Sequence, residues 1–92
     1  MMQLEIITPE KLIYEGFVSL IRVPGTQGSF EVLQNHAPII STLEEGLVKV
    51  VDDKNNIRYF DLTGGVIEVL DNKIVVLADA NTAVSKMEMP PR

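Results

Sequence analysis

His36 is the side chain best suited to acid–base chemistry near neutral pH. A histidine that acts as general base needs a nucleophile or substrate beside it, and usually a carboxylate that orients its ring. None of the serines lies in a Gly-x-Ser-x-Gly nucleophile elbow; they are Ser19, Ser29, Ser41 and Ser85. We therefore expect His36 to hydrogen-bond main-chain or partner atoms in a loop, and we predict a protein without catalytic residues.

The sequence also has few residues that could bind a metal ion or a phosphate group. The sequence has no cysteine and one histidine, so carboxylates would have to provide the ligands. The acidic pairs at 44–45 and 52–53 are adjacent, and neighbouring side chains on a strand point to opposite faces. Gly25 and Gly28 resemble part of a phosphate loop, but no lysine or helix pattern follows directly. We expect no metal and no cofactor.

Composition limits the partners. The 92 residues include 8 basic and 13 acidic side chains, for a formal net charge of −5. Such a domain repels the phosphates of nucleic acid and anionic lipid. The start of the chain lacks the pattern of a signal peptide, and the longest apolar run, residues 74–78, is too short to span a bilayer. We expect a soluble cytoplasmic chain that reaches a membrane only through a partner.

The elements that must position these residues are strands, because apolar residues recur with a period of two. Hydrophobic residues make up 46 % of the chain and aromatic ones 5 %, so Ile, Leu and Val dominate. Turn signals recur about every 8–12 residues, as in sandwiches and barrels. We predict an all-β fold, an antiparallel two-sheet β-sandwich of about ten short strands. The clearest cover residues 4–8, 11–15, 17–23, 29–33, 38–43, 47–51, 57–62, 66–70 and 73–78.

Turn chemistry connects these segments. Pro24-Gly25 favours a type II turn. Residues 47–62 and 66–78 each have the pattern of a hairpin. Gly64-Gly65, between the hairpins, indicates a bulge or a close backbone approach. Phe30 lies in a glycine-flanked, weakly charged segment, and two alternatives stay open: an exposed contact point or a lid folded onto the core.

The ordered set of motifs resembles one known family, the ε subunit of bacterial F-type ATP synthases (the mitochondrial δ subunit), in its N-terminal β-sandwich domain. The resemblance covers about residues 3–84, so we expect an ε-type sandwich at 1–84 and a partly ordered tail at 85–92. Its motifs are Val23-Pro24-Gly25 with Gly28, Val32-Leu33, His36-Ala37-Pro38, Leu43 with Gly46, Gly64-Gly65-Val66-Ile67-Glu68-Val69 and Val75-Val76-Leu77-Ala78-Asp79.

Two departures from the family concern the loop beside His36 and the length of the chain. The family usually has Gly at Glu31 and Pro-Gly at Gln34-Asn35, which bears on the shape of that loop. Its members usually continue into a two-helix C-terminal domain that can restrain ATP hydrolysis. The sequence ends at Arg92 without such a pattern. If this is the whole protein, the resemblance implies assembly and coupling without that brake; if the chain is truncated, the question of the brake stays open.

The resemblance implies a non-catalytic rotor subunit of a proton-translocating ATP synthase, peripheral on the cytoplasmic side of the bacterial inner membrane. It would link the γ subunit to the c-subunit ring. The implied c-ring contacts are Thr26, Gln27, Gly28, Ser29, Phe30 and Glu31, and the implied γ contacts are His36, Ala37, Pro38, Ser41 and Thr42. The alternative is a stand-alone β-sandwich module that binds a small ligand or peptide, although the chain has few aromatic residues to line a pocket.

Overall fold

The computed structural model describes residues 1–79 and 82–84, and these residues form strands without any helix. Within this part of the chain, no helix is long and apolar enough to cross a bilayer. The predicted tail at 85–92 lies outside the described residues. The nine strands are β1 (Met2–Ile7), β2 (Leu12–Gly25), β3 (Gly28–Leu33), β4 (Ile39–Leu43), β5 (Gly46–Asp52), β6 (Ile57–Leu62), β7 (Gly65–Leu70), β8 (Lys73–Ala78) and β9 (Ala83–Val84).

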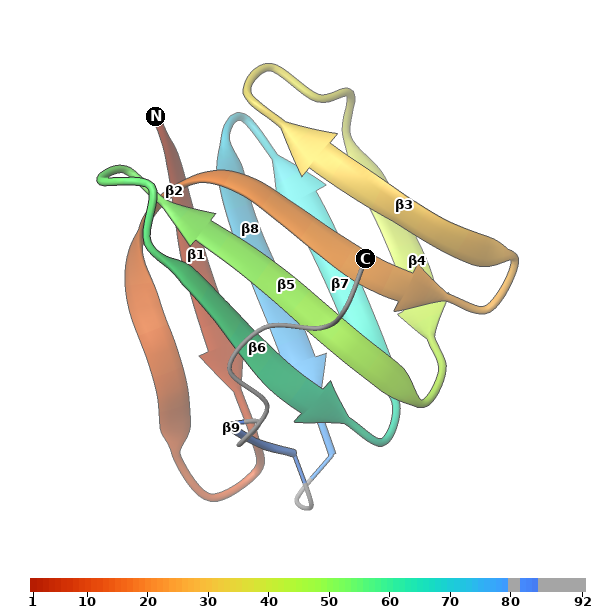
Figure 1. Cartoon of the computed structure of the whole chain (residues 1–92). Coiled ribbons are helices and arrows are strands. Elements are labelled where there is room, and N and C mark those ends of the chain that lie inside the picture. Colours follow the sequence, from red (N-terminus) through yellow and green to blue (C-terminus); the bar gives the residue numbers. More distant parts are fainter. Residues whose placement is uncertain (80–81, 85–92) are drawn as a thin grey trace.

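The strands form two layers that share β2 (Figure 1). The first half of β2 pairs with β1, and the back layer runs β2–β1–β8–β7–β4. The second half pairs with both β3 and β5, and the front layer runs β3–β2–β5–β6–β9. The predicted segments 11–15 and 17–23 are therefore one continuous strand through Gly16. β2 passes from the back layer to the front layer near a register shift between Val18 and Leu20. An irregularity of this kind bends a strand, which lets β2 belong to both layers.

The all-β sandwich prediction is confirmed, but the sheet is not purely antiparallel. β1 pairs with β8 in parallel, from Gln3 opposite Lys73 to Ile7 opposite Leu77. All other strand pairs are antiparallel among the described residues. Alternation and turn signals identify hairpin partners, whereas β1 and β8 lie near opposite ends of the sequence. Their pairing depends on how the layers close.

The core lies between the layers and is filled by one side of each alternating strand. In β1, for example, Met2, Leu4 and Ile6 are buried, while Gln3 and Glu5 are only half-buried. The ring of Tyr14 meets that of Phe60 edge-to-face, with centroids 5.7 Å apart. Close packing of branched side chains gives the domain an interior that deforms little. The buried members of the core include Val18, Ile21, Val23, Val32, Val48, Val50, Leu62, Ile67, Val69, Ile74 and Val76.

The prediction of a turn at Pro24-Gly25 is wrong, because the turn lies two residues further along the chain. Both lie in β2, where they pair with Ser29 and Gly28, and Thr26-Gln27 form the turn. Gly28 has a φ of +125°, which favours glycine at the end of this turn. Pro24 is buried, and its carbonyl accepts a hydrogen bond from the Glu44 amide at 2.8 Å. The Pro-Gly pair therefore ends a strand instead of reversing the chain.

Candidate functional site

His36 is held by its own loop. Its main-chain amide donates to the carbonyl of Leu33 at 3.1 Å, and its Nδ1 lies 2.7 Å from the carbonyl oxygen of Ala37. A carbonyl can only accept, so Nδ1 carries the proton. This agrees with the expected hydrogen bond to main-chain atoms. Among the residues that the structure describes, no three His, Cys, Asp or Glu side chains are grouped to hold a metal.

The predicted c-ring contacts lie on the β2–β3 hairpin. Thr26, Gln27 and Gly28 are exposed at its tip, whereas 28–31 belong to β3 and not to a loop. Phe30 is half-buried and packs against the core, so the lid alternative describes its side chain. The exposed tip of the hairpin is therefore smaller than the predicted six-residue loop.

The predicted γ contacts fall at two ends of β4 and on two faces. His36, Ala37 and Pro38 precede the strand. At its other end, Thr42 meets the hairpin tip: the Thr26 and Thr42 hydroxyls are 2.9 Å apart, and the Thr26 amide donates to the Thr42 carbonyl at 3.1 Å. Ser41 is half-buried and alternates in direction with exposed Thr42. The structure thus joins Thr42 to the hairpin and separates it from His36.

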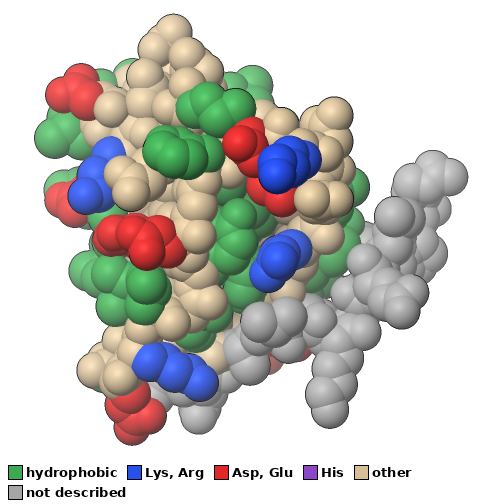
Figure 2. Space-filling model, turned by 90° about the vertical axis from the view of Figure 1, so that its left-hand side faces the viewer, with side chains coloured by type: hydrophobic (Ala, Val, Ile, Leu, Met, Phe, Trp, Pro, Cys, Tyr) green, Lys and Arg blue, Asp and Glu red, His purple; other side chains and the backbone are tan. Residues whose placement is uncertain are grey.

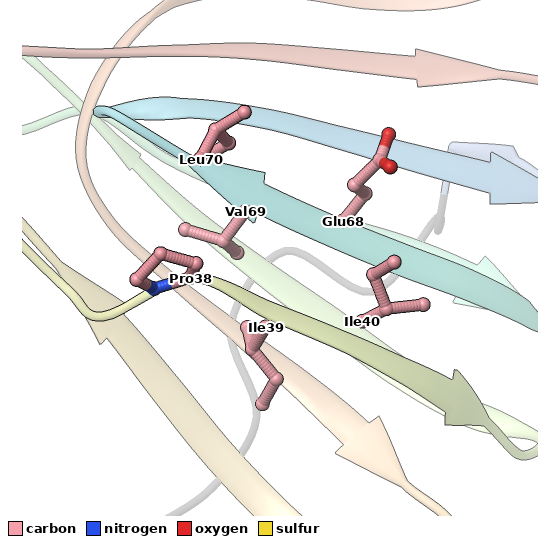
Figure 3. A pocket seen from close by; sticks show the side chains of 6 residues that line it. All are labelled: Pro38, Ile39, Ile40, Glu68, Val69 and Leu70. Atoms are coloured by element: carbon pink, nitrogen blue, oxygen red, sulfur yellow. The ribbon is translucent and has the colours of Figure 1, made fainter.

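A shallow pocket of about 380 Å³ opens between the start of β4 and the end of β7 (Figure 3). Its lining is aliphatic apart from one carboxylate, and consists of Pro38, Ile39, Ile40, Glu68, Val69 and Leu70. Figure 3 shows Glu68 and Leu70 projecting from the same side of β7. Ile40 of β4 lies opposite Glu68 of β7 and is 73 % exposed. Single exposed apolar residues are common, so the extent of the apolar surface around Ile40 decides its meaning.

The apolar surface continues past the pocket. A second hollow of about 310 Å³, lined by Glu68, Leu70, Lys73 and Val75, shares two residues with the first. Strand pairing puts the side chains of these residues and of Leu77 on the outer side of the back layer. We call this surface the outer apolar face and define it by Ile40, Val66, Leu70, Val75 and Leu77.

Sequence reasoning named Pro38 of the pocket but missed the outer apolar face. The available signal was the consecutive apolar pairs Ile39-Ile40 and Val69-Leu70. Successive side chains of a strand point to opposite sides, so one member of each pair must face outward. A strand with apolar residues on both sides indicates burial on both sides.

Acidic side chains lie within and beside the outer apolar face, and Glu68 lies directly between Ile40 and Val75. Glu5 and Glu15 lie directly opposite each other on β1 and β2, and Val75 separates Glu5 from Glu68. Like charges directly opposite each other are destabilising in the free domain. Figure 2 shows the side that lies at the left in Figure 1, where acidic, basic and hydrophobic groups are interspersed.

Asp52, at the β5–β6 turn, and Tyr14, on β2, have shifted pKa values. Hydrogen bonds from the Asn56 and Lys54 amides to its carboxylate hold the pKa of Asp52 below its ordinary value. Burial, together with the charge of Asp52, raises the pKa of Tyr14. Arg58 lies 5.7 Å from the centroid of the Tyr14 ring. None of these three residues lines the pocket.

The model of one protein family matches residues 1–84: the β-sandwich domain of the ATP synthase delta/epsilon chain. The chain belongs to this family. The ATP synthase epsilon chain of Pelotomaculum thermopropionicum is 37 % identical over 87 residues, which are 95 % of this chain and 64 % of that one. That of Desulfatibacillum aliphaticivorans is 38 % identical over 77 residues, 84 % of this chain and 55 % of that one. The chain thus spans less than two thirds of the length of these relatives.

Solved structures show the same fold for this member of the delta/epsilon family. A chain of the Euglena gracilis mitochondrial ATP synthase (OSCP, F1 and c-ring) superposes with a TM-score of 0.81 at 17 % identity. The superposed part covers 90 % of this chain and 52 % of the Euglena chain. A chain of the Tetrahymena thermophila mitochondrial ATP synthase, central stalk and c-ring, superposes with a TM-score of 0.69 at 25 % identity. The match covers 85 % of this chain and 63 % of that one.

Proposed function

We propose that this chain is a non-catalytic rotor subunit of the central stalk of a proton-translocating F-type ATP synthase. It links the γ subunit to the c-subunit ring, and so couples ion flow to ATP synthesis. It is peripheral to the bacterial inner membrane on the cytoplasmic side, and is held there only by the complex. The observation that carries this proposal is the outer apolar face, on a domain of the delta/epsilon family.

The outer apolar face is the proposed γ contact. Ile40, on the last strand of the back layer, is the most exposed of the large hydrophobic residues that the structure describes. Covering such a side chain is worth about 1.5–3 kcal/mol. The acidic residues Glu5, Glu15 and Glu68 favour a partner with basic groups within and beside this contact, because opposite charges would relieve their mutual repulsion. His36, Ala37 and Pro38 extend this contact at one end of β4.

The β2–β3 hairpin is the proposed c-ring contact. Its exposed tip, Thr26-Gln27, lies at the opposite end of β4 from Pro38, so the two partners would bind at separate places on one body. The double link between Thr26 and Thr42 and the core packing of Phe30 hold the hairpin on the sandwich. A domain that passes torque between two partners needs this stiffness, because a flexible hairpin would yield before the ring turned the shaft.

A stand-alone ligand-binding module is the second candidate. The pocket at Pro38 favours it only by its volume of about 380 Å³. Small-molecule sites usually combine an enclosed apolar lining with several convergent polar groups. Here the lining is aliphatic, and Glu68 is its one charged side chain. Such a surface suits a protein side chain better than a free ligand.

The test is reconstitution. We expect membrane vesicles that contain an ATP synthase depleted of its own ε subunit to show little ATP-driven proton pumping. Adding this chain should restore ATP-driven proton pumping, measured as quenching of a pH-sensitive dye. A folded chain that binds neither γ nor the complex, or that binds and leaves pumping unrestored, would contradict the proposal.

A further inference from the structure

Two asparagines from separate loops form a reciprocal hydrogen-bonded pair beside the pocket. The Asn35 main-chain amide donates to Asn72 Oδ1 at 2.6 Å, and Asn72 Nδ2 donates to Asn35 Oδ1 at 3.1 Å. Asn35 lies between β3 and β4, and Asn72 lies in the turn between β7 and β8. The pair therefore connects two segments that are 37 residues apart in the sequence.

Both residues occupy backbone positions that would suit glycine. Asn35 has φ of +67° and Asn72 has φ of +63°. Asp71-Asn72, both with positive φ, form a two-residue hairpin turn, in which glycine is strongly favoured at the second position. Glycine would meet the backbone demand at either place but would not supply the side-chain bonds. Asparagine also tolerates a positive φ, and at these two places it supplies the bonds that join the two loops.

The pair ties together the two walls of the pocket. Asn35 lies three residues before Pro38, which opens the β4 wall, and Asn72 lies two residues after Leu70, which ends the β7 wall. Asn72 is itself fixed, because its carbonyl accepts a hydrogen bond from the Gln3 amide of β1 at 2.9 Å. The loop carrying His36 and Pro38 is thus anchored to a turn that is anchored to the sheet.

We propose that the Asn35–Asn72 pair is a positioning element that holds the His36–Pro38 segment in its partner-binding conformation. The inference rests on the proposed γ contact and adds to it residues outside the contact surface. Ordering a loop on binding lowers affinity, and a loop that is already ordered avoids this loss. The pair acts through the pocket wall and need not touch the partner.

The test measures the affinity of the γ subunit for three variants by calorimetry. Asn72→Gly removes both bonds and keeps a residue suited to the turn, so the fold should be retained while the dissociation constant rises about tenfold. Asn35→Asp keeps both bonds, because a carboxylate oxygen still accepts from Asn72 Nδ2, and its affinity should stay within about twofold. Asn55→Gly is the matched control, since Asn55 also has φ of +67° but lies in the β5–β6 turn.

Hydrogen exchange gives a second readout. The Asn35 amide should exchange about tenfold faster in Asn72→Gly than in the unsubstituted or Asn35→Asp domain, because it loses its acceptor. Unchanged affinity of Asn72→Gly, or an equal loss in Asn55→Gly, would overturn the inference while leaving the proposed function standing. Absence of γ binding by the unsubstituted chain would instead overturn the proposed function, and this inference with it.

Discussion

The ring of Phe30 closes directly over Gly25 on the neighbouring strand. A Cβ atom on Gly25 would lie 2.8 Å from Phe30 Cε1 and 2.7 Å from the carbonyl oxygen of Gly28. No real side chain fits between these atoms. The absence of a side chain at Gly25 therefore lets the hairpin close, and lets an aromatic ring near its tip pack against the core.

Gly25→Ala should destabilise the domain by about 1–3 kcal/mol, the usual range for forcing a methyl group into a packed site. Thermal unfolding followed by circular dichroism measures the change. Gln27→Ala is the control, because Gln27 is exposed at the tip and its loss should change stability by less than about 0.5 kcal/mol. Equal stability of Gly25→Ala and Gln27→Ala would contradict the packing described for Phe30.

Gly65→Ala should destabilise the domain by about 3 kcal/mol. A Cβ atom at Gly65 would overlap the main-chain carbonyl oxygen of Leu77, which is held in the β7–β8 ladder and cannot swing aside. Gly16→Ala is a matched control, because the nearest atom to its Cβ is the Tyr14 hydroxyl at 3.1 Å, on a side chain that can shift. Urea unfolding measures the free energy of unfolding of both variants. A smaller loss of stability in Gly65→Ala than in Gly16→Ala would contradict the close approach at Gly65.

The stability of the domain should depend on Asp52 at acidic pH. Amide hydrogen bonds from Asn56 and Lys54 lower its pKa below the ordinary 3.8. A group with a lowered folded-state pKa contributes stability above its unfolded pKa, and that contribution is lost as the pH falls through the folded-state value. The free energy of unfolding of Asp52→Asn should therefore change less than that of the unsubstituted chain as the pH falls below about 4.

The control for this pH experiment is Asp53→Asn, which makes the same change of charge one residue along the turn. Among the described residues, the hydrogen bonds of the turn go to the Asp52 carboxylate and not to that of Asp53. Asp53→Asn should retain the acid-induced loss of stability. Parallel pH profiles for Asp52→Asn and the unsubstituted chain would exclude the assigned role of Asp52.

A bulky residue at the hairpin tip should uncouple the complex without releasing the chain from γ. Gln27→Trp leaves the outer apolar face intact and adds volume where the c-ring is proposed to bind. We expect ATP hydrolysis with reduced proton pumping in reconstituted vesicles. Lys54→Trp, at the exposed β5–β6 turn, should pump normally. An unchanged ratio of pumping to hydrolysis in Gln27→Trp would remove the hairpin from the proposed contacts.

The local part of the fold follows from the sequence. The hairpins at 47–62 and 66–78 appear as β5–β6 and β7–β8, because alternation and turn residues lie within one stretch of chain. The close approach expected at Gly64-Gly65 is also present, at Gly65. The parallel β1–β8 pair and the sharing of β2 between layers could not be predicted this way. Both depend on contacts between distant segments, which leave no periodic pattern.

The candidate site was predicted less completely. Pro38 was among the predicted contacts, and it lines the pocket. Ile40, Leu70 and Leu77 are exposed, but in the sequence they cannot be told from core residues, because the pattern shows only that they are apolar. Their outward direction depends on register, which the sequence does not state. Asn35 and Asn72 likewise look like ordinary turn residues until the fold brings their side chains together.

The central claim is that the outer apolar face binds γ, and Ile40→Asp tests it most directly. Calorimetry against the γ subunit should show about a hundredfold loss of affinity, because a charge replaces an exposed apolar anchor. Ile57→Asp makes the same substitution on β6 of the front layer, where Ile57 is 40 % exposed, and should bind as the unsubstituted chain does. Both variants should keep the circular dichroism spectrum of the folded domain. Full affinity in a folded Ile40→Asp variant, or an equal loss in Ile57→Asp, would contradict the account.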